Sequence, residues 1–394
     1  MQLAQLVSIR PDFACLFDSV DTEPKKETCE KSQKQRKRKK LVALLLSVMM
    51  CFACVSALAD TYVSWYTYGD VYLSSVRSEM EADFAKLNLT INGSDANGNQ
   101  QVQSDFISTA LMNNDCEAIV VNLVESGAIS TAQTIMNQIQ AAGIPTVWFN
   151  RPVSTNNEEA ANLFLNNPAS AFVGTNFEDA GVMQGELIGQ YLVEHYNDID
   201  LNGDGKISYI MFKGDEANQE AIARTALAVE YANKALVAAG KPEIEFYDAS
   251  NANKYLVDPN GSWSNVFSSE QMQTVLSMYN EGNGNMVELV ICNNDDMAYG
   301  AVMALQNAGY NHGEGTTAIP VFGVDATDVA KDLINNGYMV GTIKQDNVGM
   351  ADAVATITAN LIAGKENKFE GLNENYVIVD NWFVQIPYAV YTGE

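Results

Sequence analysis

Strand-like and helix-like segments alternate along most of this chain. Runs rich in β-branched and aromatic residues, such as 61–66 and 118–123, precede segments with a helical apolar pattern, such as 73–87 and 128–142. This alternation predicts βαβ units, in which parallel sheets are covered by helices on both faces. We therefore expect an α/β fold of the doubly wound, Rossmann-like type.

The pattern continues through the second half of the chain. Further strands are expected at 145–150, 208–212, 287–292, 319–323 and 339–343, and further helices at 217–239 and 298–308. The 394 residues, 47% of them hydrophobic, exceed what one ordinary core accommodates. Two domains are the expectation.

The N-terminal residues differ in composition from the rest. A basic run at 34–40 leads into an apolar run at 41–53, and small residues end at Ala59. This order is typical of a signal peptide, and the apolar run is short for a membrane-spanning helix. We predict that residues 1–59 are an N-terminal extension and signal peptide, and that the exported protein is periplasmic or extracellular. Lipid anchoring through Cys54 is an alternative.

The charge beyond residue 59 is strongly negative. Those residues include 13 Lys and Arg and 43 Asp and Glu, a net charge of −30. Such a surface repels nucleic acid and anionic membranes, which argues against a transcription regulator. Cys116 and Cys292, the two cysteines in this part, adjoin apolar strand-like runs and are expected to be buried free thiols.

The sequence favours binding over catalysis. It contains no dinucleotide fingerprint, P-loop or Gly-x-Ser-x-Gly elbow, and its two histidines have no metal-ligand spacing. In folds of this class, ligands gather at the carboxyl ends of strands. The short polar side chains expected there belong to Asp70, Asn122, Asn150, Asn294, Asp295 and Asp325.

One acidic loop has the opening pattern of a calcium site. Asp200, Asn202 and Asp204 occupy loop positions 1, 3 and 5, and Gly205 follows where an EF-hand loop turns sharply. Position 12 is Met211, whose thioether cannot replace the closing carboxylate. The last ligand must therefore come from elsewhere in the fold. A solvated turn rich in Asp and Asn is the alternative.

These residues together resemble a known family. The segments that carry the likeness are 66–70, 121–124, 173–175, 213–214, 223–225, 293–298 and 321–325. Over essentially all of 60–394 the chain resembles the periplasmic D-galactose/D-glucose-binding proteins, which are sugar-binding components of ABC transporters with the periplasmic binding protein type I fold. The resemblance implies two Rossmann-like domains joined by a hinge, and no enzyme activity.

The resemblance also implies domain boundaries. The first sugar-binding domain is expected at 60–149 plus 345–379, and the second, with the calcium site, at 150–344 plus 380–394. Hinge closure around a galactose or glucose molecule is the expected mechanism, followed by delivery to the permease of an ABC transporter. A chemoreceptor is a further expected partner, and the protein is expected to be a monomer.

The binding residues carry over by position. Those expected to hold the sugar are Asp70, Tyr72, Asn122, Asn218, Glu220, Arg224, Trp263, Asn294, Asp325 and Gln345. Carboxylates, amides and Arg can pair with sugar hydroxyls, and Tyr72 and Trp263 are expected to sandwich the ring. Asn218, Glu220, Gln345 and Tyr72 stand where the family has His, Asp, Asn and Phe, which is expected to alter the preference among sugars.

The family's calcium loop is completed by a remote Glu, and Glu288 falls at the matching place. The implied ligands of a structural Ca²⁺ are Asp200, Asn202, Asp204, the carbonyl of Lys206, Ser208 and Glu288. A calcium-stabilised enzyme acting on carbohydrate, with Asp70 and Asp325 as its carboxylate pair, is one alternative function. A sugar sensor that docks on a chemoreceptor is another.

Overall fold

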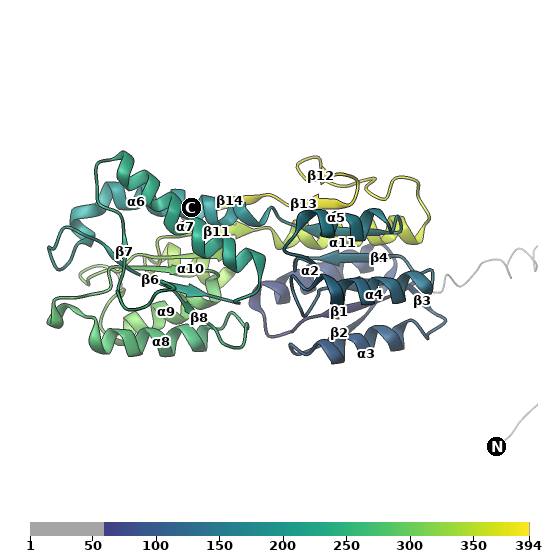
Figure 1. Cartoon of the computed structure of the whole chain (residues 1–394), viewed down its shortest axis with the longest axis horizontal. Helices are drawn as coiled ribbons and strands as arrows, with labels where there is room; N and C mark the ends of the chain where they lie inside the picture. The colour runs from purple at the N-terminus through teal and green to yellow at the C-terminus, as the bar shows by residue number, and fades with distance from the viewer. Residues whose placement is uncertain (1–58, 394) are drawn as a thin grey trace, which may run out of the picture. The chain divides into compact units, whose positions relative to one another are not determined.

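Two mainly parallel sheets organise residues 59–393, which are the residues described by this computed structural model. The first sheet has the strand order β12-β13-β5-β4-β3-β1-β2. The second has the order β14-β11-β10-β9-β6-β7, and β8 pairs with β6. We call each sheet with its helices a lobe, and Figure 1 shows the first lobe on the right and the second on the left. The predicted α/β fold with two Rossmann-like units is confirmed.

The first lobe draws its elements from both ends of the described chain. Its strands are β1 (Ala59–Trp65), β2 (Leu89–Asp95), β3 (Cys116–Val121), β4 (Thr146–Phe149), β5 (Ser170–Gly174), β12 (Val377–Val379) and β13 (Phe383–Gln385). Its helices are α2 (Val71–Lys86), α3 (Gln100–Ala110), α4 (Ile129–Ala141), α5 (Asn157–Leu165) and α11 (Asn347–Ile362). Helices α2 and α11 pack on one face of the sheet, and α3, α4 and α5 pack on the other.

The second lobe has the same layered construction. Its strands are β6 (Ser208–Lys213), β7 (Glu245–Phe246), β8 (Leu256–Val257), β9 (Leu289–Cys292), β10 (Val321–Asp325), β11 (Gly341–Gln345) and β14 (Tyr388–Tyr391). Its helices are α6 (Phe177–Ile199), α7 (Gln219–Ala238), α8 (Asn265–Met278), the 3-10 turn η1 (Glu281–Asn283), α9 (Asp295–Asn307) and α10 (Asp328–Asn335). Helices α6 and α7 cover one face, and α8, α9 and α10 cover the other.

The α6–α7 pair depends on glycine at its contact face. A Cβ atom on Gly185 would lie 2.7 Å from the carbonyl oxygen of Ala228 and from Cβ of Tyr231. Gly181 and Gly189 make similarly close approaches on the same face. The spacing of four residues places all three glycines on one side of α6. Their small size lets α7 approach closely, and α7 carries several residues of the site described below.

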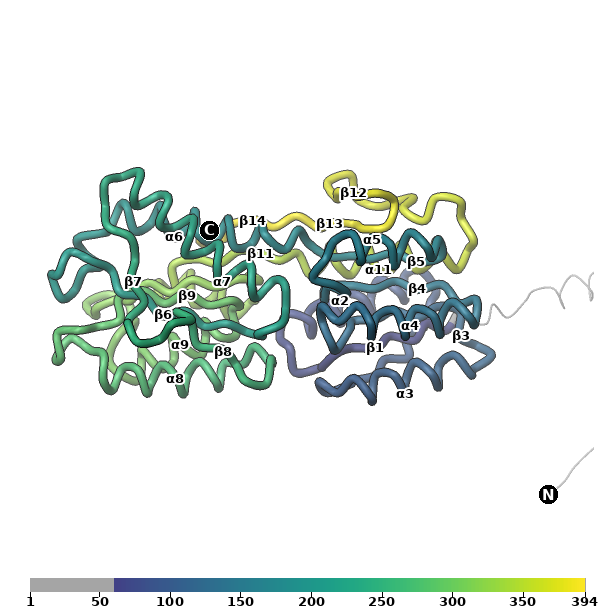
Figure 2. Tube along the Cα trace, viewed as in Figure 1, coloured from purple at the N-terminus to yellow at the C-terminus, as the bar shows by residue number. Residues whose placement is uncertain are grey.

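The chain crosses between the lobes three times. It passes from β5 to α6, from β11 to α11 and from β13 to β14. The tube in Figure 2 follows the last crossing, where one extended segment runs from β13 to β14. Each crossing spans a few residues, which is the construction expected of a hinge.

The sheets divide the chain differently from the expected domain boundaries. The first break, expected at residue 150, falls after β5, because β5 pairs in parallel with β4 and extends the first sheet. The last segment, expected wholly in the second domain, is shared: β13 pairs with β5 in the first sheet, and β14 pairs with β11 in the second. The break expected at 345 falls one residue later, since β11 includes Gln345.

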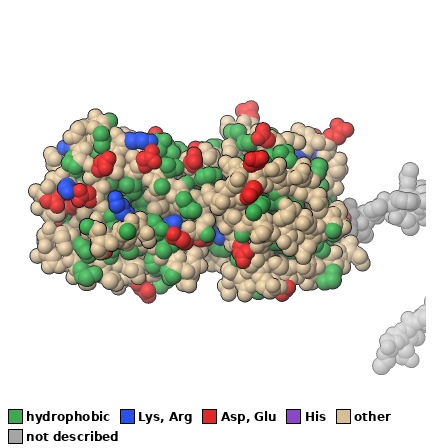
Figure 3. Space-filling model, viewed as in Figure 1, with side chains coloured by type: hydrophobic (Ala, Val, Ile, Leu, Met, Phe, Trp, Pro, Cys, Tyr) green, Lys and Arg blue, Asp and Glu red, His purple; other side chains and the backbone are tan. Residues whose placement is uncertain are grey.

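The predicted signal segment lies outside the described residues except for Ala59, the first residue of β1. Between residues 59 and 393, no helix is long and apolar enough to cross a bilayer. Cys116 and Cys292 are buried free thiols, as predicted. Acidic side chains are spread over both lobes on the face drawn in Figure 3, in keeping with the negative charge.

Candidate functional site

A small cavity lies at the carboxyl ends of strands from both lobes. Its lining residues are Asp70, Tyr72, Asn150, Arg151, Asn218, Glu220, Arg224, Trp263, Asn294, Asp325 and Gln345. The volume open to a water-sized molecule between them is about 30 Å³. A water molecule's share of liquid volume is also about 30 Å³, so a larger ligand requires the lining residues to move apart. Nine of the ten residues predicted to bind sugar therefore line one cavity.

Both lobes contribute an aromatic ring to the lining. Tyr72 lies in the first turn of α2 in the first lobe, and Trp263 precedes α8 in the second. Both are buried. Trp263 has a φ of 57°, in the left-handed region that a bulky residue rarely adopts, so the surrounding structure holds it in an unfavourable conformation. A Cβ atom on Gly214 would overlap the indole ring, which explains the glycine there.

Three lining residues also cap helices. The side chains of Asp70, Asn218 and Asn294 accept hydrogen bonds from the first backbone N–H groups of α2, α7 and α9. Capping the following helix is a common role for a polar residue that follows a strand. The structure combines the two, because a cap at the start of a helix also lies at the carboxyl edge of the sheet.

Arg224 on α7 is the central buried cation. Its Nη2 donates to Glu220 Oε2 at 2.8 Å, to Gln345 Oε1 at 2.9 Å and to the Tyr388 hydroxyl at 3.1 Å. Its Nη1 lies 4.0 Å from Asp325 Oδ1. Burial alone would lower the pKa of Arg224, but Tyr388, Glu220 and Asp325 together raise it. The guanidinium therefore stays charged and fixed in position.

Asp325 is the carboxylate most affected by its surroundings. Burial raises its pKa well above the usual range, and nearby acidic groups add to the effect, whereas Arg224 lowers it. Its φ of 124° and that of Ala326, 56°, are strained values for residues with side chains. Asp295, beneath this turn, accepts hydrogen bonds from Thr327 N at 2.8 Å and Thr342 Oγ1 at 2.6 Å. Asp295 thus positions the turn without lining the cavity.

Four buried polar atoms of the lining have no hydrogen-bond partner among the described residues. They are Tyr72 Oη, Arg224 Nε, Trp263 Nε1 and Gln345 Nε2. Buried polar groups are nearly always satisfied in folded proteins, because leaving one unpaired costs roughly 1–3 kcal/mol. A ligand with several hydroxyl groups would supply the missing partners.

Asn122 is the predicted binding residue that does not line the cavity. Its Oδ1 accepts from Tyr66 N at 3.2 Å, and its Nδ2 donates to the Phe149 carbonyl at 3.1 Å. It is fully buried, and the amide connects the ends of neighbouring strands. The structure gives Asn122 a structural role, because both ends of its side chain already have backbone partners.

Two residues of the lining were missed as binding residues, although Asn150 was expected at a strand end. Asn150 follows β4 with a φ of 61°, and Arg151 comes next. Arg151 donates from Nε to the Leu123 carbonyl at 2.7 Å and lies over the Tyr66 ring, 4.0 Å from its centre. The positively charged side chain two residues after β4 was the sequence signal that could have identified Arg151 as a binding residue.

Arg151 also reaches the other lobe. Its Nη2 lies 3.5 Å from Asp215 Oδ2, and both side chains are at least four-fifths buried. Nearby, Asn218 Nδ2 donates to Ser126 Oγ at 3.4 Å, again from the second lobe to the first. These two contacts close one side of the cavity.

Comparison with known proteins agrees with this geometry. The family model described as periplasmic binding protein domain matches residues 61–366. The chain belongs to the periplasmic binding protein family. It is therefore a binding protein and not an enzyme, and the carbohydrate-active enzyme considered above is set aside.

Two curated relatives cover most of this periplasmic binding protein. The D-galactose/methyl-galactoside binding periplasmic protein MglB of Haemophilus influenzae is 29% identical over 335 residues, 83% of this chain and 90% of the relative. A putative rhizopine-binding protein of Rhizobium meliloti is 27% identical over 340 residues, 83% of this chain and 92% of the relative.

Solved structures support the fold of the binding protein. An ABC transporter solute binding protein from Bacillus halodurans with bound myo-inositol has a TM-score of 0.61 at 21% identity, covering 86% of this chain and 95% of its own. Another from Clostridium phytofermentans, with bound β-D-glucose, has a TM-score of 0.63 at 17% identity, covering 84% and 94%.

The loop predicted to bind calcium lies in the second lobe of the binding protein, between α6 and β6. Glu288 reaches it as predicted: Oε1 accepts from Leu201 N at 2.8 Å and Asn202 N at 3.3 Å, and Oε2 accepts from Ser208 N at 2.9 Å. Burial raises the pKa of Glu288, against these backbone hydrogen bonds. One buried carboxylate therefore joins both ends of the loop.

The other hydrogen bonds of the 200–208 loop decide whether its oxygen atoms are available to a calcium ion. Asp200 accepts from Asp204 N at 3.1 Å and from Gly205 N at 2.9 Å, and Lys206 Nζ pairs with Glu245. The available oxygen donors suit a hard cation. However, these carboxylates already accept backbone N–H groups, and no cluster of three or more His, Cys, Asp or Glu side chains within 59–393 is arranged to hold a metal. Calcium stays a prediction.

Proposed function

We propose that this protein is the extracytoplasmic sugar-binding component of an ABC transporter, and that it binds one monosaccharide between its lobes. The observation that carries the proposal is the cavity at the strand ends, where four buried polar atoms lack partners and each lobe contributes an aromatic ring. Sugars combine hydroxyl groups with flat apolar faces, and such a lining complements both.

Galactose and glucose are the first candidates for the ligand. The curated relative at 29% identity is named for D-galactose and methyl-galactoside, and one similar structure contains β-D-glucose. Other relatives are named for rhizopine or contain myo-inositol, so cyclic polyols belong in the same test. The differences from the resembled family at Asn218, Glu220 and Gln345 are where we expect the preference to be set.

We further propose that binding is coupled to hinge closure. The lining residues come from both lobes, and a ligand that touches both stabilises the closed arrangement by its differential affinity for it. Three short crossings provide the hinge. The permease is the expected recipient of the closed form, and docking on a chemoreceptor stays a prediction.

Isothermal calorimetry with galactose, glucose, allose, ribose, arabinose, xylose and myo-inositol tests the proposal. We expect one of the hexoses to bind in a one-to-one complex. If none of the seven ligands binds to folded protein, the proposed function is wrong.

Asp325→Ala tests the site directly. Since removing one partner of a buried hydrogen bond costs about 1–3 kcal/mol, we expect sugar affinity to fall by roughly five-fold to more than a hundred-fold. Asp328→Ala is the matched control, because Asp328 is three residues away with its side chain 99% exposed. Equal affinities of the two variants would contradict the assigned role of Asp325.

A further inference from the structure

Each of the three crossings between the lobes brings one buried polar side chain to Arg224 or Glu220. Thr175 lies in the crossing from β5 to α6, Gln345 directly precedes the crossing to α11, and Tyr388 directly follows the crossing from β13. Gln345 and Tyr388 are also paired residues of β11 and β14. The hinge and the sugar site therefore meet at these side chains.

Four of the side chains form a closed circle of hydrogen bonds, which we call the hinge network: Arg224, Tyr388, Thr175 and Glu220. The Tyr388 hydroxyl accepts from Arg224 Nη2 at 3.1 Å and donates to Thr175 Oγ1 at 3.1 Å. Thr175 Oγ1 donates to Glu220 Oε1 at 2.7 Å, and Glu220 Oε2 accepts from Arg224 Nη2 at 2.8 Å. The Tyr388 hydroxyl also lies 3.3 Å from Glu220 Oε1. Removing either hydroxyl therefore interrupts the circle.

The hinge network is buried. Each of its four side chains belongs to a residue that is less than one-tenth exposed. Burial raises the pKa of the Tyr388 hydroxyl well above its usual value, so this group keeps its proton at neutral pH and can donate it. Because an unpaired polar group is costly in such surroundings, the four side chains have few alternative arrangements.

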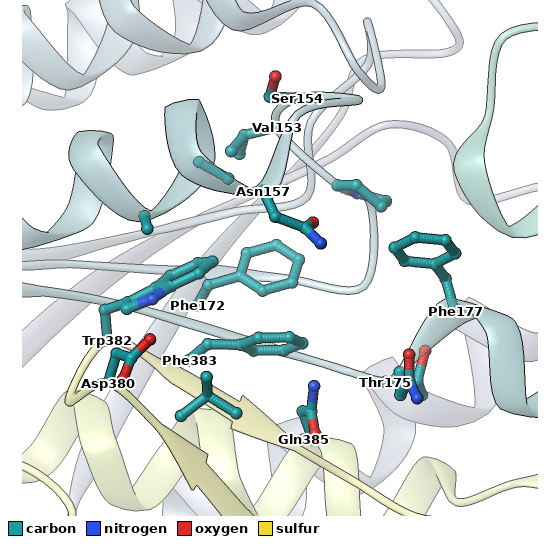
Figure 4. Close-up of a pocket in the computed structure, with 15 residues that line it drawn as sticks. Val153, Ser154, Asn157, Phe172, Thr175, Phe177, Asp380, Trp382, Phe383 and Gln385 are labelled. Carbon is teal, nitrogen blue, oxygen red and sulfur yellow. The ribbon is translucent and has the colours of Figure 1, made fainter.

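The two hydroxyl residues of the hinge network lie outside the sugar cavity. Arg224 and Glu220 line that cavity, whereas Tyr388 and Thr175 do not. Thr175 lines a separate cavity of about 190 Å³ in the first lobe, which Figure 4 shows. Since the space on that side leaves Thr175 without close packing there, its hydrogen bonds decide its orientation. The two hydroxyls can therefore act on a bound sugar only through Arg224 and Glu220.

We propose that Tyr388 and Thr175 are positioning residues of the sugar site. Their hydroxyls hold Arg224 and Glu220 in the orientation that binds the sugar. Because Thr175 and Tyr388 belong to the first and third crossings, a change in the hinge also moves these two binding side chains. The inference rests on the proposed function, since its readout is sugar binding.

Tyr388→Phe tests the first positioning residue. The change removes one hydroxyl and keeps the aromatic side chain, so that Arg224 and Thr175 each lose a partner. We expect the folded variant to bind the sugar that calorimetry identifies roughly three- to tenfold more weakly than the unmodified protein does.

Tyr391→Phe is the matched control for this variant. It makes the same change in the same strand, at an exposed hydroxyl that donates to Asn335 of the second lobe. We expect it to leave the sugar affinity unchanged. Equal losses in the two variants, or no loss in Tyr388→Phe, would overturn the positioning role.

Thr175 separates the effect of the hydroxyl from that of packing. Thr175→Val keeps nearly the same shape without the hydroxyl, whereas Thr175→Ser keeps the hydroxyl and loses the methyl group. We expect the valine variant to bind the sugar roughly three- to tenfold more weakly and the serine variant to retain most of the affinity. A serine variant that binds as weakly as the valine variant would overturn the role of the hydroxyl.

The double variant Tyr388→Phe/Thr175→Val tests whether the two residues act as one unit. Its loss of affinity should not exceed that of the weaker-binding single variant, because either change already interrupts the hinge network. Losses that add on a free-energy scale would contradict the network, and circular dichroism checks that every variant is folded. If the unmodified protein binds no sugar, the proposed function fails together with this inference. If it binds sugar and Tyr388→Phe binds equally tightly, only the inference fails.

Discussion

Individual side chains in this protein serve two purposes at the strand ends. Asn218 accepts backbone N–H groups with Oδ1 and donates with Nδ2 to Ser126 of the other lobe. Asp70 caps α2 with Oδ1 and accepts from the Tyr66 hydroxyl with Oδ2 at 2.7 Å. Both side chains are therefore held in place before a ligand arrives, which reduces the entropy lost on binding.

Gly214 gives a first prediction at the residue scale. Gly214→Ala is expected to displace the Trp263 indole, since the new Cβ would overlap the ring. Sugar affinity should fall by roughly tenfold or more, while the fold persists. Calorimetry measures the affinity, and circular dichroism measures the fold. Gly282→Ala, at an exposed position without a left-handed φ and away from the cavity, is the comparison; equal losses in both variants would contradict the role of the close approach.

Asp295 gives a prediction on pH. Burial raises its pKa from 3.8 to about 7. The folded state therefore holds a proton that the unfolded state has lost between these pH values. Its contribution to the free energy of unfolding should fall as the pH rises from 3.8 to about 7, and level off above that.

Asp295→Asn removes this titration with little change of shape. The amide can still accept from Thr327 N and donate to Thr342 Oγ1. Urea unfolding at several pH values should therefore show a flatter profile for the variant between pH 4 and 7. Identical profiles for the variant and the unmodified protein would show that Asp295 does not titrate in this range.

At the scale of elements, the 200–208 loop depends on a residue from another segment. The two carboxylate oxygens of Glu288 accept hydrogen bonds from three backbone N–H groups. In Glu288→Gln an NH₂ group replaces one of these oxygens, so that one donor faces another donor. We expect a lower melting temperature and a loss of roughly 1–3 kcal/mol in stability. Glu245→Gln, which changes an exposed partner of Lys206, is the control.

The same variant addresses calcium. If calcium binds the loop, adding it in place of a chelator should raise the melting temperature of the unmodified protein, because a ligand of the native state alone stabilises it. Glu288→Gln should reduce that rise. A melting temperature that is the same in calcium and in chelator would show that the calcium prediction is wrong.

The central elements were predictable from sequence because their signals are local. The expected strands at 118–123 and 145–150 correspond to β3 and β4, and the expected helix at 217–239 corresponds to α7. Short strands at the sheet edges, such as β7 and β12, have no comparable signal, since two or three residues carry no periodicity. Their position depends on pairing with distant strands.

The sequence predicted those residues of the candidate site that lie at the end of a strand. It predicted less well whether such a side chain is free to bind a ligand, because that depends on its hydrogen bonds to neighbouring strands. Asp325 lies at the end of β10, so its place in the lining follows from the fold. Asn122 occupies an equivalent place, yet its amide bonds to Tyr66 N and the Phe149 carbonyl. Only the neighbouring strands reveal that difference, and these are remote in sequence.

At the scale of the molecule, the Arg151–Asp215 pair joins the lobes beside the cavity. Asp215→Asn is expected to weaken sugar binding by at least a few-fold, because it leaves the largely buried Arg151 without its charged partner, and to reduce the salt dependence of binding. Glu216→Gln is the control, since its partner Lys213 belongs to the same lobe. Unchanged affinity in Asp215→Asn would argue against a role in closure.

The consecutive strands β13 and β14 have a consequence for how the protein folds. Each of them completes a different sheet, although only two residues separate them. They are the last two elements of the described fold to be translated. Neither lobe can therefore reach its final strand order during most of synthesis, and the first lobe must wait until all of the second lobe except β14 has been translated. A nascent chain of this kind stays incompletely folded for longer than one whose domains are contiguous.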